Sequence, residues 1–136
     1  MILTNPTGKG VRNDACGAGT FGAKRGNRSH NGTDYLCTEG QEILSPITGV
    51  CVRHSKPYKD DLRFDGVLIK GKRVSIKLWY FSPDNEIIGQ WVRAGSVIGR
   101  AQSISQKYGK RCLDHVHLQI ERLDPEVLME DVLTHI

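Results

Sequence analysis

The sequence has little of what marks a membrane protein or a nucleic-acid-binding protein. None of its apolar runs approaches the roughly 18 residues that a membrane-spanning helix needs. Its first ten residues, MILTNPTGKG, lack the basic start and the long apolar stretch of a signal peptide. The lysines and arginines are scattered, so the net charge of +4 predicts a mildly basic surface without a nucleic-acid-binding motif. We therefore expect neither membrane insertion nor a nucleic-acid partner.

Cysteine is scarce, and its spacing excludes one class of metal site. The four cysteines are Cys16, Cys37, Cys51 and Cys112. They form no C-x-x-C pair, which a cysteine zinc ribbon would need, and an even count is compatible with two disulfides in any of three pairings. Acceptor patterns for N-glycosylation also occur at Asn27 and Asn31. We expect an extracellular protein whose signal peptide is absent from this chain; the alternative is a cytosolic protein.

Turn residues and alternating apolar residues predict a mainly β protein with a loop-rich N-terminus. Residues 8–34 are rich in Gly, Asn, Arg and Lys, which is typical of loops. After them, short apolar segments with a period of two alternate with turns, as expected of strands. The predicted strand segments are 40–54, 64–81, 89–102 and 114–121, the first three each containing a turn. Pro125 opens a short C-terminal helix predicted over residues 124–136.

Two of the five histidines stand two residues apart in the segment RCLDHVHLQIER. On a strand, alternate side chains point to opposite faces, so His115 and His117 share a face with Gln119, while Val116 and Leu118 face the core. The two histidines are then expected in a groove. They are either a pair of hydrogen-bonded surface histidines or part of a metal site, because neutral imidazole is a common zinc ligand.

A metal site needs further ligands, and the segment SHNGTDY offers them. Asn31-Gly32 is typical of a tight turn, which brings His30 and Asp34 on its two flanks toward one point. Catalytic zinc sites use three protein ligands of the His and carboxylate types and leave a fourth position to water. With the later H-x-H, the segment therefore provides a suitable ligand set.

The pairing of H-x-G-x-D with H-x-H resembles the lysostaphin-type zinc metallopeptidases, which cut glycine-containing bridges in bacterial cell walls. EGQEILSPITGVCV is similar to the family pattern G-x-x-V-x-A-P-x-x-G-x-V, VRAGSVIGRAQ to V-x-x-G-x-x-I-G, and DHVHLQIE to H-L-H-F-E. The resemblance covers about residues 28–122 in the family's order. It implies a mainly β fold with an antiparallel sheet of the lysostaphin (duplicated hybrid motif) kind, in one zinc metallopeptidase-like domain over residues 1–136.

Within that family, the chain is most similar to the leukocyte cell-derived chemotaxins, which are secreted signalling proteins. The similarity is carried by HNGTDYLC, SPITGVCVRHSKPY, GVLIKGK and KLWYFSP. It implies that Zn²⁺ is bound by His30, Asp34 and His117, and that His115 matches the histidine beside the metal-bound water.

The resemblance also bears on the disulfides. Related chemotaxins bridge positions similar to Cys16 and Cys37, so this pairing is expected here. Cys51 and Cys112 would then pair by elimination, which departs from the cysteine placement of the relatives.

The chain departs from the active peptidases at a second, non-ligand histidine in a strand of the form L-Y-x-H. The matching stretch here is Leu78-Trp79-Tyr80-Phe81, so Phe81 stands where that histidine is expected, and Tyr80 is expected to face the core. Phenylalanine can neither donate a hydrogen bond nor carry charge. His54 is a substitute candidate on another strand.

These observations lead to one main hypothesis and two alternatives. The main one is a secreted, zinc-binding, non-catalytic protein that acts in signalling, chemotaxis or binding through a cell-surface receptor or glycan. The first alternative is an active zinc endopeptidase that cleaves peptidoglycan peptide bridges with His115. The second is a protein that recognises the bacterial cell wall without cutting it.

Overall fold

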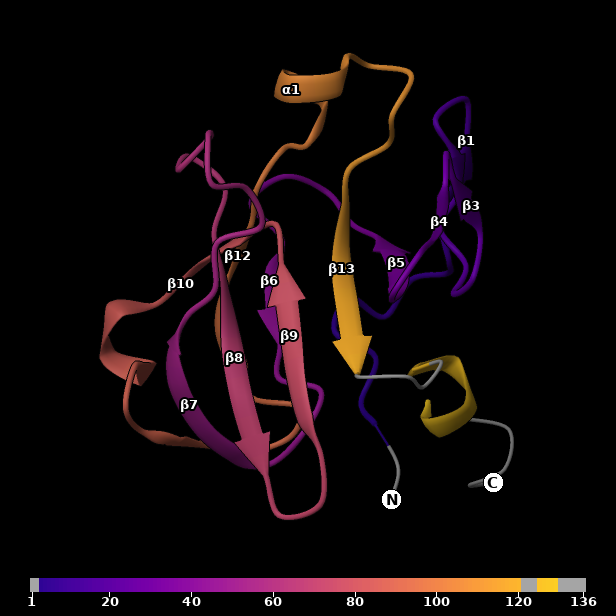
Figure 1. The fold of residues 1–136 in the computed structure, drawn as a ribbon. Coiled ribbons are helices and arrows are strands. Elements are labelled where there is room, and N and C mark those ends of the chain that lie inside the picture. Colours follow the sequence, from indigo (N-terminus) through magenta and orange to yellow (C-terminus); the bar gives the residue numbers. More distant parts are fainter. Residues whose placement is uncertain (1–2, 121–124, 130–136) are drawn as a thin grey trace.

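The computed structural model describes residues 3–120 and 125–129, and these form antiparallel sheets (Figure 1). The six-stranded sheet has the order β11-β7-β8-β9-β13-β5, the three-stranded sheet has the order β10-β12-β6, and two hairpins, β1-β2 and β3-β4, have two-residue strands. The strands are β1 (Asn13–Asp14), β2 (Gly17–Ala18), β3 (Lys24–Arg25), β4 (Arg28–Ser29), β5 (Thr33–Leu36), β6 (Glu42–Leu44), β7 (Gly49–His54), β8 (Gly66–Gly71), β9 (Ser75–Trp79), β10 (Phe81–Pro83), β11 (Trp91–Val92), β12 (Val97–Ala101) and β13 (His115–Ile120).

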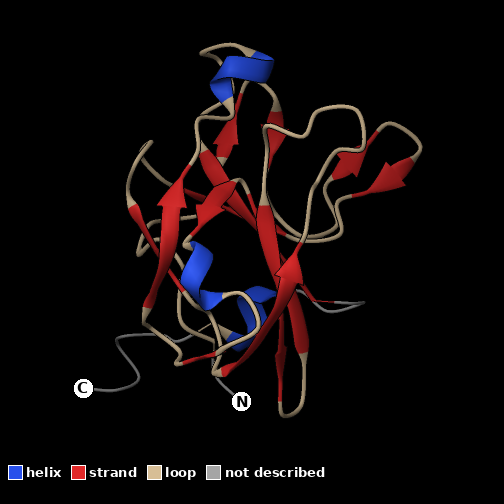
Figure 2. Ribbon diagram, turned by 90° about the vertical axis from the view of Figure 1, so that its left-hand side faces the viewer, coloured by secondary structure: helices blue, strands red, loops and turns tan. Residues whose placement is uncertain are grey.

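The core lies between the two larger sheets, which are seen from a second side in Figure 2. One buried cluster contains Val67 on β8 and Leu118 on β13 of the six-stranded sheet together with Ile43 and Ile98 of the three-stranded sheet. Each of these four side chains is fully buried, because strand alternation sends it to the inner face of its sheet. The predicted mainly β fold is confirmed, and the opposite face of the six-stranded sheet is left to carry polar groups.

The helical segments are short. They are η1 (Asn85–Ile87), α1 (Ser105–Tyr108) and η2 (Pro125–Leu128). The predicted C-terminal helix begins with the 3₁₀ turn at Pro125, while Asp124 and residues 130–136 lie outside the described residues. None of the described helices is long and apolar enough to cross a membrane.

The end of β9 differs from the sequence-based expectation. Tyr80 has a φ of 77°, a backbone conformation that residues other than glycine rarely adopt. It interrupts the alternation of inward and outward side chains between β9 and β10. Phe81 is consequently in the core with no exposed surface, and Tyr80 lies on the outer face, where it lines a pocket. The predicted placement of these two residues is wrong, because the alternation from Val74 onward does not continue past Trp79.

The predicted cysteine pairings are also wrong. Cys16 is bonded to Cys112, with a Cα–Cα distance of 5.4 Å, whereas Cys37 and Cys51 are free thiols. Asp14 brings the two bonded segments together, because its Oδ2 accepts a hydrogen bond from the backbone N–H of Leu113 at 2.8 Å. The inward face of β7 directs Cys51 into the core, where it is fully buried.

Candidate metal centre

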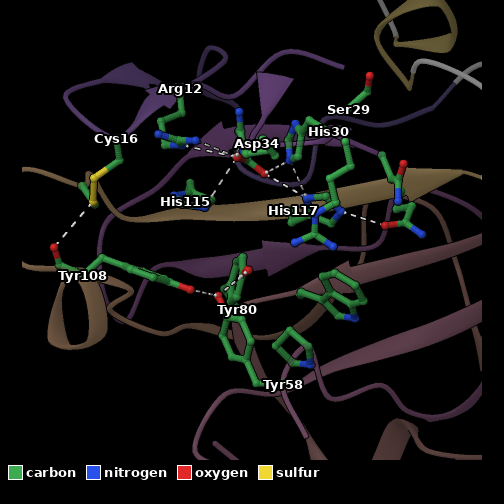
Figure 3. Close-up of a pocket in the computed structure, with 17 residues that line it drawn as sticks. Arg12, Cys16, Ser29, His30, Asp34, Tyr58, Tyr80, Tyr108, His115 and His117 are labelled. Atoms are coloured by element: carbon green, nitrogen blue, oxygen red, sulfur yellow. Dashed lines mark hydrogen bonds and ion pairs between the residues drawn. A yellow bond between two sulfur atoms is a disulfide. The ribbon is translucent and has the colours of Figure 1, made fainter. Parts of the chain in front are cut away.

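The three expected ligands meet on the outer face of the six-stranded sheet (Figure 3). Asp34 on β5 lies directly opposite His117 on β13, and His30 precedes β5. The expected hairpin turn between His30 and Asp34 does not form: β4 pairs with β3, and β5 pairs with β13. The segment between them is instead a connection from one sheet to another.

Gly32 allows this connection to pass close to β13. A Cβ atom at this position would lie 2.4 Å from the carbonyl oxygen of Leu118 and 2.7 Å from the His117 ring. No φ in the left-handed region is involved. Glycine is therefore required for close approach rather than for turn geometry.

The ligand atoms form a compact triangle. His117 Nδ1 lies 3.0 Å from Asp34 Oδ1, and His30 Nε2 lies 3.1 Å from His117 Nδ1 and 3.3 Å from Asp34 Oδ1. A tetrahedral zinc ion with bonds of about 2.0 Å separates its ligand atoms by about 3.3 Å. The triangle therefore has nearly the edge length that such an ion requires.

Hydrogen bonds outside the triangle fix the tautomers of both histidines. The Nδ1–H of His30 donates to the carbonyl oxygen of Thr20 at 3.0 Å, and the Nε2–H of His117 donates to Oε1 of Gln119 at 3.0 Å. Each ring therefore turns an unprotonated nitrogen toward the triangle. Outer hydrogen bonds of this kind orient histidine ligands in metal sites.

Asp34 is oriented in the same way by Arg12. Its Oδ2 accepts hydrogen bonds from Nε and Nη2 of Arg12 at 3.3 and 3.1 Å, which leaves Oδ1 for the triangle. Burial by itself raises the pKa of Asp34, but the imidazoles of His117, His30 and His115 around the carboxylate outweigh it and hold the pKa well below its usual range. The carboxyl group is therefore ionised at neutral pH.

Three acceptor atoms thus converge in a nearly buried space, with exposed fractions of only 3% for Asp34 and 5% for His117. Their lone pairs repel one another unless a cation lies between them. The group formed by His30, Asp34 and His117 can therefore hold a metal ion.

His115 lies beside the triangle but is not part of it. Its Nδ1–H donates to the carbonyl oxygen of Leu113 at 2.8 Å, so its unprotonated Nε2 faces the site, 3.7 Å from Asp34 Oδ2. Burial lowers the pKa of His115 more than the charge of Asp34 raises it, which favours neutral imidazole. His115 is thus placed to accept a proton.

Tyr80 lies beside His115 in the pocket, whereas Phe81, which matches the second histidine of the peptidases in the sequence, is in the core. The rings of Tyr80 and His115 meet edge-on with centroids 5.3 Å apart. The hydroxyl of Tyr58 is hydrogen-bonded to the hydroxyl of Tyr80 at 2.9 Å and to that of Tyr108 at 2.7 Å. His54 is no substitute, because it lies outside the residues that line the pocket and is hydrogen-bonded to Asp65 at 2.9 Å.

These residues line a pocket of about 540 Å³. Its floor is the outer face of the sheet, where Trp79 stacks on His117 with ring centroids 4.9 Å apart. Its sides are formed by the N-terminal arm, defined as residues 8–32, by the loop around Tyr58 and by the segment around Tyr108 at the end of α1. Sequence reasoning missed Arg12 and Tyr108, because no local pattern distinguishes them from surface residues, and it placed Tyr80 in the core.

Comparison with known proteins identifies two kinds of relative. The chain is 30% identical to leukocyte cell-derived chemotaxin-2 of Bos taurus over 118 residues, which cover 85% of this chain and 76% of the relative. It is 35% identical to the Mus musculus protein of the same name over 71 residues, or 52% of this chain and 47% of the relative. No family model matches the chain.

Solved structures share the fold at low sequence identity. Helicobacter pylori Csd3 superposes with a TM-score of 0.70 and 19% identity, covering 97% of this chain and 34% of that chain. The catalytic domain of the antimicrobial peptidase lysostaphin from Staphylococcus simulans superposes with a TM-score of 0.54 and 20% identity, covering 85% and 87%. The lysostaphin-type peptidase fold expected from the sequence is thereby confirmed.

Proposed function

Because the chain belongs to the leukocyte cell-derived chemotaxin-2 family, we propose that it is an extracellular zinc-binding protein that acts in signalling or chemotaxis without peptidase activity. The observation that carries the proposal is the convergence of three lone pairs at His30, Asp34 and His117 beside a single non-ligand histidine. The first feature supports metal binding, and the second supports the loss of catalysis. The disulfide between Cys16 and Cys112 supports an oxidising compartment.

The donor set favours zinc over other divalent ions. Two imidazole nitrogens and one carboxylate oxygen suit zinc, whereas calcium and magnesium prefer sites made of oxygen atoms alone. A bound ion would join His30 of the N-terminal arm to Asp34 on β5 and His117 on β13, so it would stabilise the folded chain. At a free concentration one hundred times its dissociation constant, this contribution is about 2.7 kcal/mol.

The pairing of His115 with Tyr80 supports the lack of peptidase activity. Burial raises the pKa of the Tyr80 hydroxyl to about 12, so at neutral pH it is an uncharged group that cannot exchange protons as a histidine does. The Tyr80 hydroxyl can still donate a hydrogen bond, but it cannot carry the positive charge of an imidazolium.

The retained His115 favours a second candidate function, zinc-dependent cleavage of peptidoglycan peptide bridges. A bound zinc ion would supply Lewis-acid polarisation, and Nε2 of His115 would take the proton of the attacking water. The fold shared with lysostaphin is compatible with this activity and equally with cell-wall recognition without cutting.

The first test is zinc content by elemental analysis of protein stripped and then reloaded with zinc. We expect one equivalent in the wild type, none in His30→Ala and one in His54→Ala, whose side chain lies outside the pocket. Absence of zinc from the wild type would refute the proposal.

Cell migration and peptide cleavage separate the functions. We expect the zinc-loaded wild type to support migration through a cell-surface receptor or glycan, and His30→Ala to lose this activity. Cleavage of a glycine-rich peptide by the wild type but not by His115→Ala would instead establish the peptidase. Sedimentation with peptidoglycan, with and without chelator, tests cell-wall recognition.

A further inference from the structure

The residues around the pocket carry an excess of positive charge, which favours an anionic ligand. Its lining contains three arginines, Arg12, Arg25 and Arg28, and one carboxylate, Asp34. Arg12 already forms an ion pair with Asp34 at 3.1 Å. Arg25 is held by two backbone carbonyl oxygens and forms an ion pair with Asp34 at 3.9 Å, whereas the exposed side chain of Arg28 forms no ion pair or hydrogen bond within residues 3–120 and 125–129. Arg12 is also paired with Asp14 at 2.7 Å, so the positive charge of Arg28 is left for a ligand, before the charge of any metal ion is counted.

The tyrosines on the opposite wall supply a hydrogen-bond donor. Tyr58, Tyr80 and Tyr108 have three hydroxyl protons, and the two hydrogen bonds among their oxygens use two of them. One proton is therefore left to donate outward. Burial raises the pKa of Tyr58 and of Tyr80, which keeps these two hydroxyls protonated at neutral pH.

A disulfide and a hydrogen bond close one end of the pocket. The disulfide joins Cys16 of the N-terminal arm to Cys112, next to the loop that carries Tyr108 (Figure 3). That loop is joined in turn to the Tyr58 loop by the hydrogen bond between the two hydroxyls at 2.7 Å. A long chain therefore cannot leave the pocket on this side without breaking these links.

A second depression adjoins the pocket. Gln119 lines both the pocket and a neighbouring hollow of about 270 Å³ on β8 and β9. Leu68, Ser75 and Lys77 complete this hollow, and Lys77 forms no ion pair with another described residue. A chain that leaves the pocket along the outer face of the sheet would therefore contact one apolar residue, Leu68, and two polar residues, Ser75 and Lys77.

We propose that the pocket binds the free C-terminal carboxylate of a peptide, whose preceding residues leave past Gln119 toward Lys77. The carboxylate is paired with Arg28 and accepts the spare tyrosine proton. A pocket that is closed at one end fits a chain terminus better than a chain that continues in both directions. This inference names the ligand of the proposed zinc-binding site and rests on that proposal.

The test uses randomised hexapeptides dansylated at their N-termini, prepared as free acids and as C-terminal amides. Fluorescence anisotropy is measured with the zinc-loaded full chain. We expect the acid pool to bind at least about tenfold more tightly than the amide pool, because the amide loses the charge that pairs with arginine. Equal binding, no binding of either pool, or equally tight binding of acetate or inorganic phosphate would overturn the inference.

Arg28→Gln should reduce the preference for the acid about tenfold, whereas Arg73→Gln should leave it unchanged. Arg73 is a matched control, because it is exposed and lies outside the pocket lining. Zinc content is measured on the same samples. A zinc-loaded protein without acid preference overturns only this inference, whereas a wild type that binds no zinc overturns the proposed function.

Discussion

Replacing Gly32 by alanine should damage the metal centre without removing a ligand. The added Cβ would lie 2.4 Å from the Leu118 carbonyl oxygen and 2.7 Å from two atoms of the His117 ring. Reaching the 3.0 Å that real Cβ atoms keep requires shifts of at least 0.6 Å (3.0 minus 2.4) and 0.3 Å (3.0 minus 2.7). Metal–ligand distances tolerate only about 0.2 Å, so the His117 nitrogen no longer fits the triangle.

We expect Gly32→Ala to weaken zinc binding roughly 10- to 100-fold, the cost of disturbing groups that orient a ligand. Overpacking should also lower the free energy of unfolding of the metal-free protein by about 1–3 kcal/mol. Competition with a chromophoric chelator measures the first quantity, and urea titration of the stripped protein measures the second.

Gly10→Ala is the matched control. Gly10 is exposed, its Cβ would meet nothing within 4 Å, and its φ lies outside the left-handed region. Zinc affinity and stability should stay near wild type. If Gly32→Ala binds zinc as tightly as Gly10→Ala, close approach does not shape the site and the reasoning fails.

Three other predictions concern the corrected positions. Phe81→Ala should lower the free energy of unfolding by about 3–5 kcal/mol because it empties a fully buried site, whereas Tyr80→Phe should lower it by less than about 1.5 kcal/mol. The reverse order in urea titrations would contradict the placement of Phe81 in the core and Tyr80 on the outer face. Cys16→Ser should lower it by roughly 2–4 kcal/mol, because the disulfide closes a loop across a sequence separation of 96; unchanged stability would speak against this linkage. Burial, aided by nearby Asp114, raises the pKa of Cys37 to about 12, so this thiol is protonated at pH 8. Ellman's reagent at pH 8 should therefore leave Cys37 unmodified in native protein and label both Cys37 and Cys51 in urea. Rapid labelling of Cys37 in native protein would refute the burial argument.

Strand alternation made much of the site predictable. A period of two is a local property of the backbone, so it places His115 and His117 together without knowledge of the fold. The ligand motif at His30 and Asp34 is equally local, and family resemblance joins it to the later strand. The prediction fails at Tyr80, where a φ of 77° places Tyr80 and Phe81 on the faces opposite to those expected.

The sequence by itself determined the mainly β content and the types of ligand residue, because both follow from neighbours along the chain. Only the tertiary structure decided the partners of residues in the loop-rich arm. Arg12 reaches Asp34 across 22 positions, and Cys16 reaches Cys112 across 96. Such pairings depend on how the arm packs against β5 and the loop before β13. No local periodicity encodes that packing, so the wall of the pocket could not be read from the sequence.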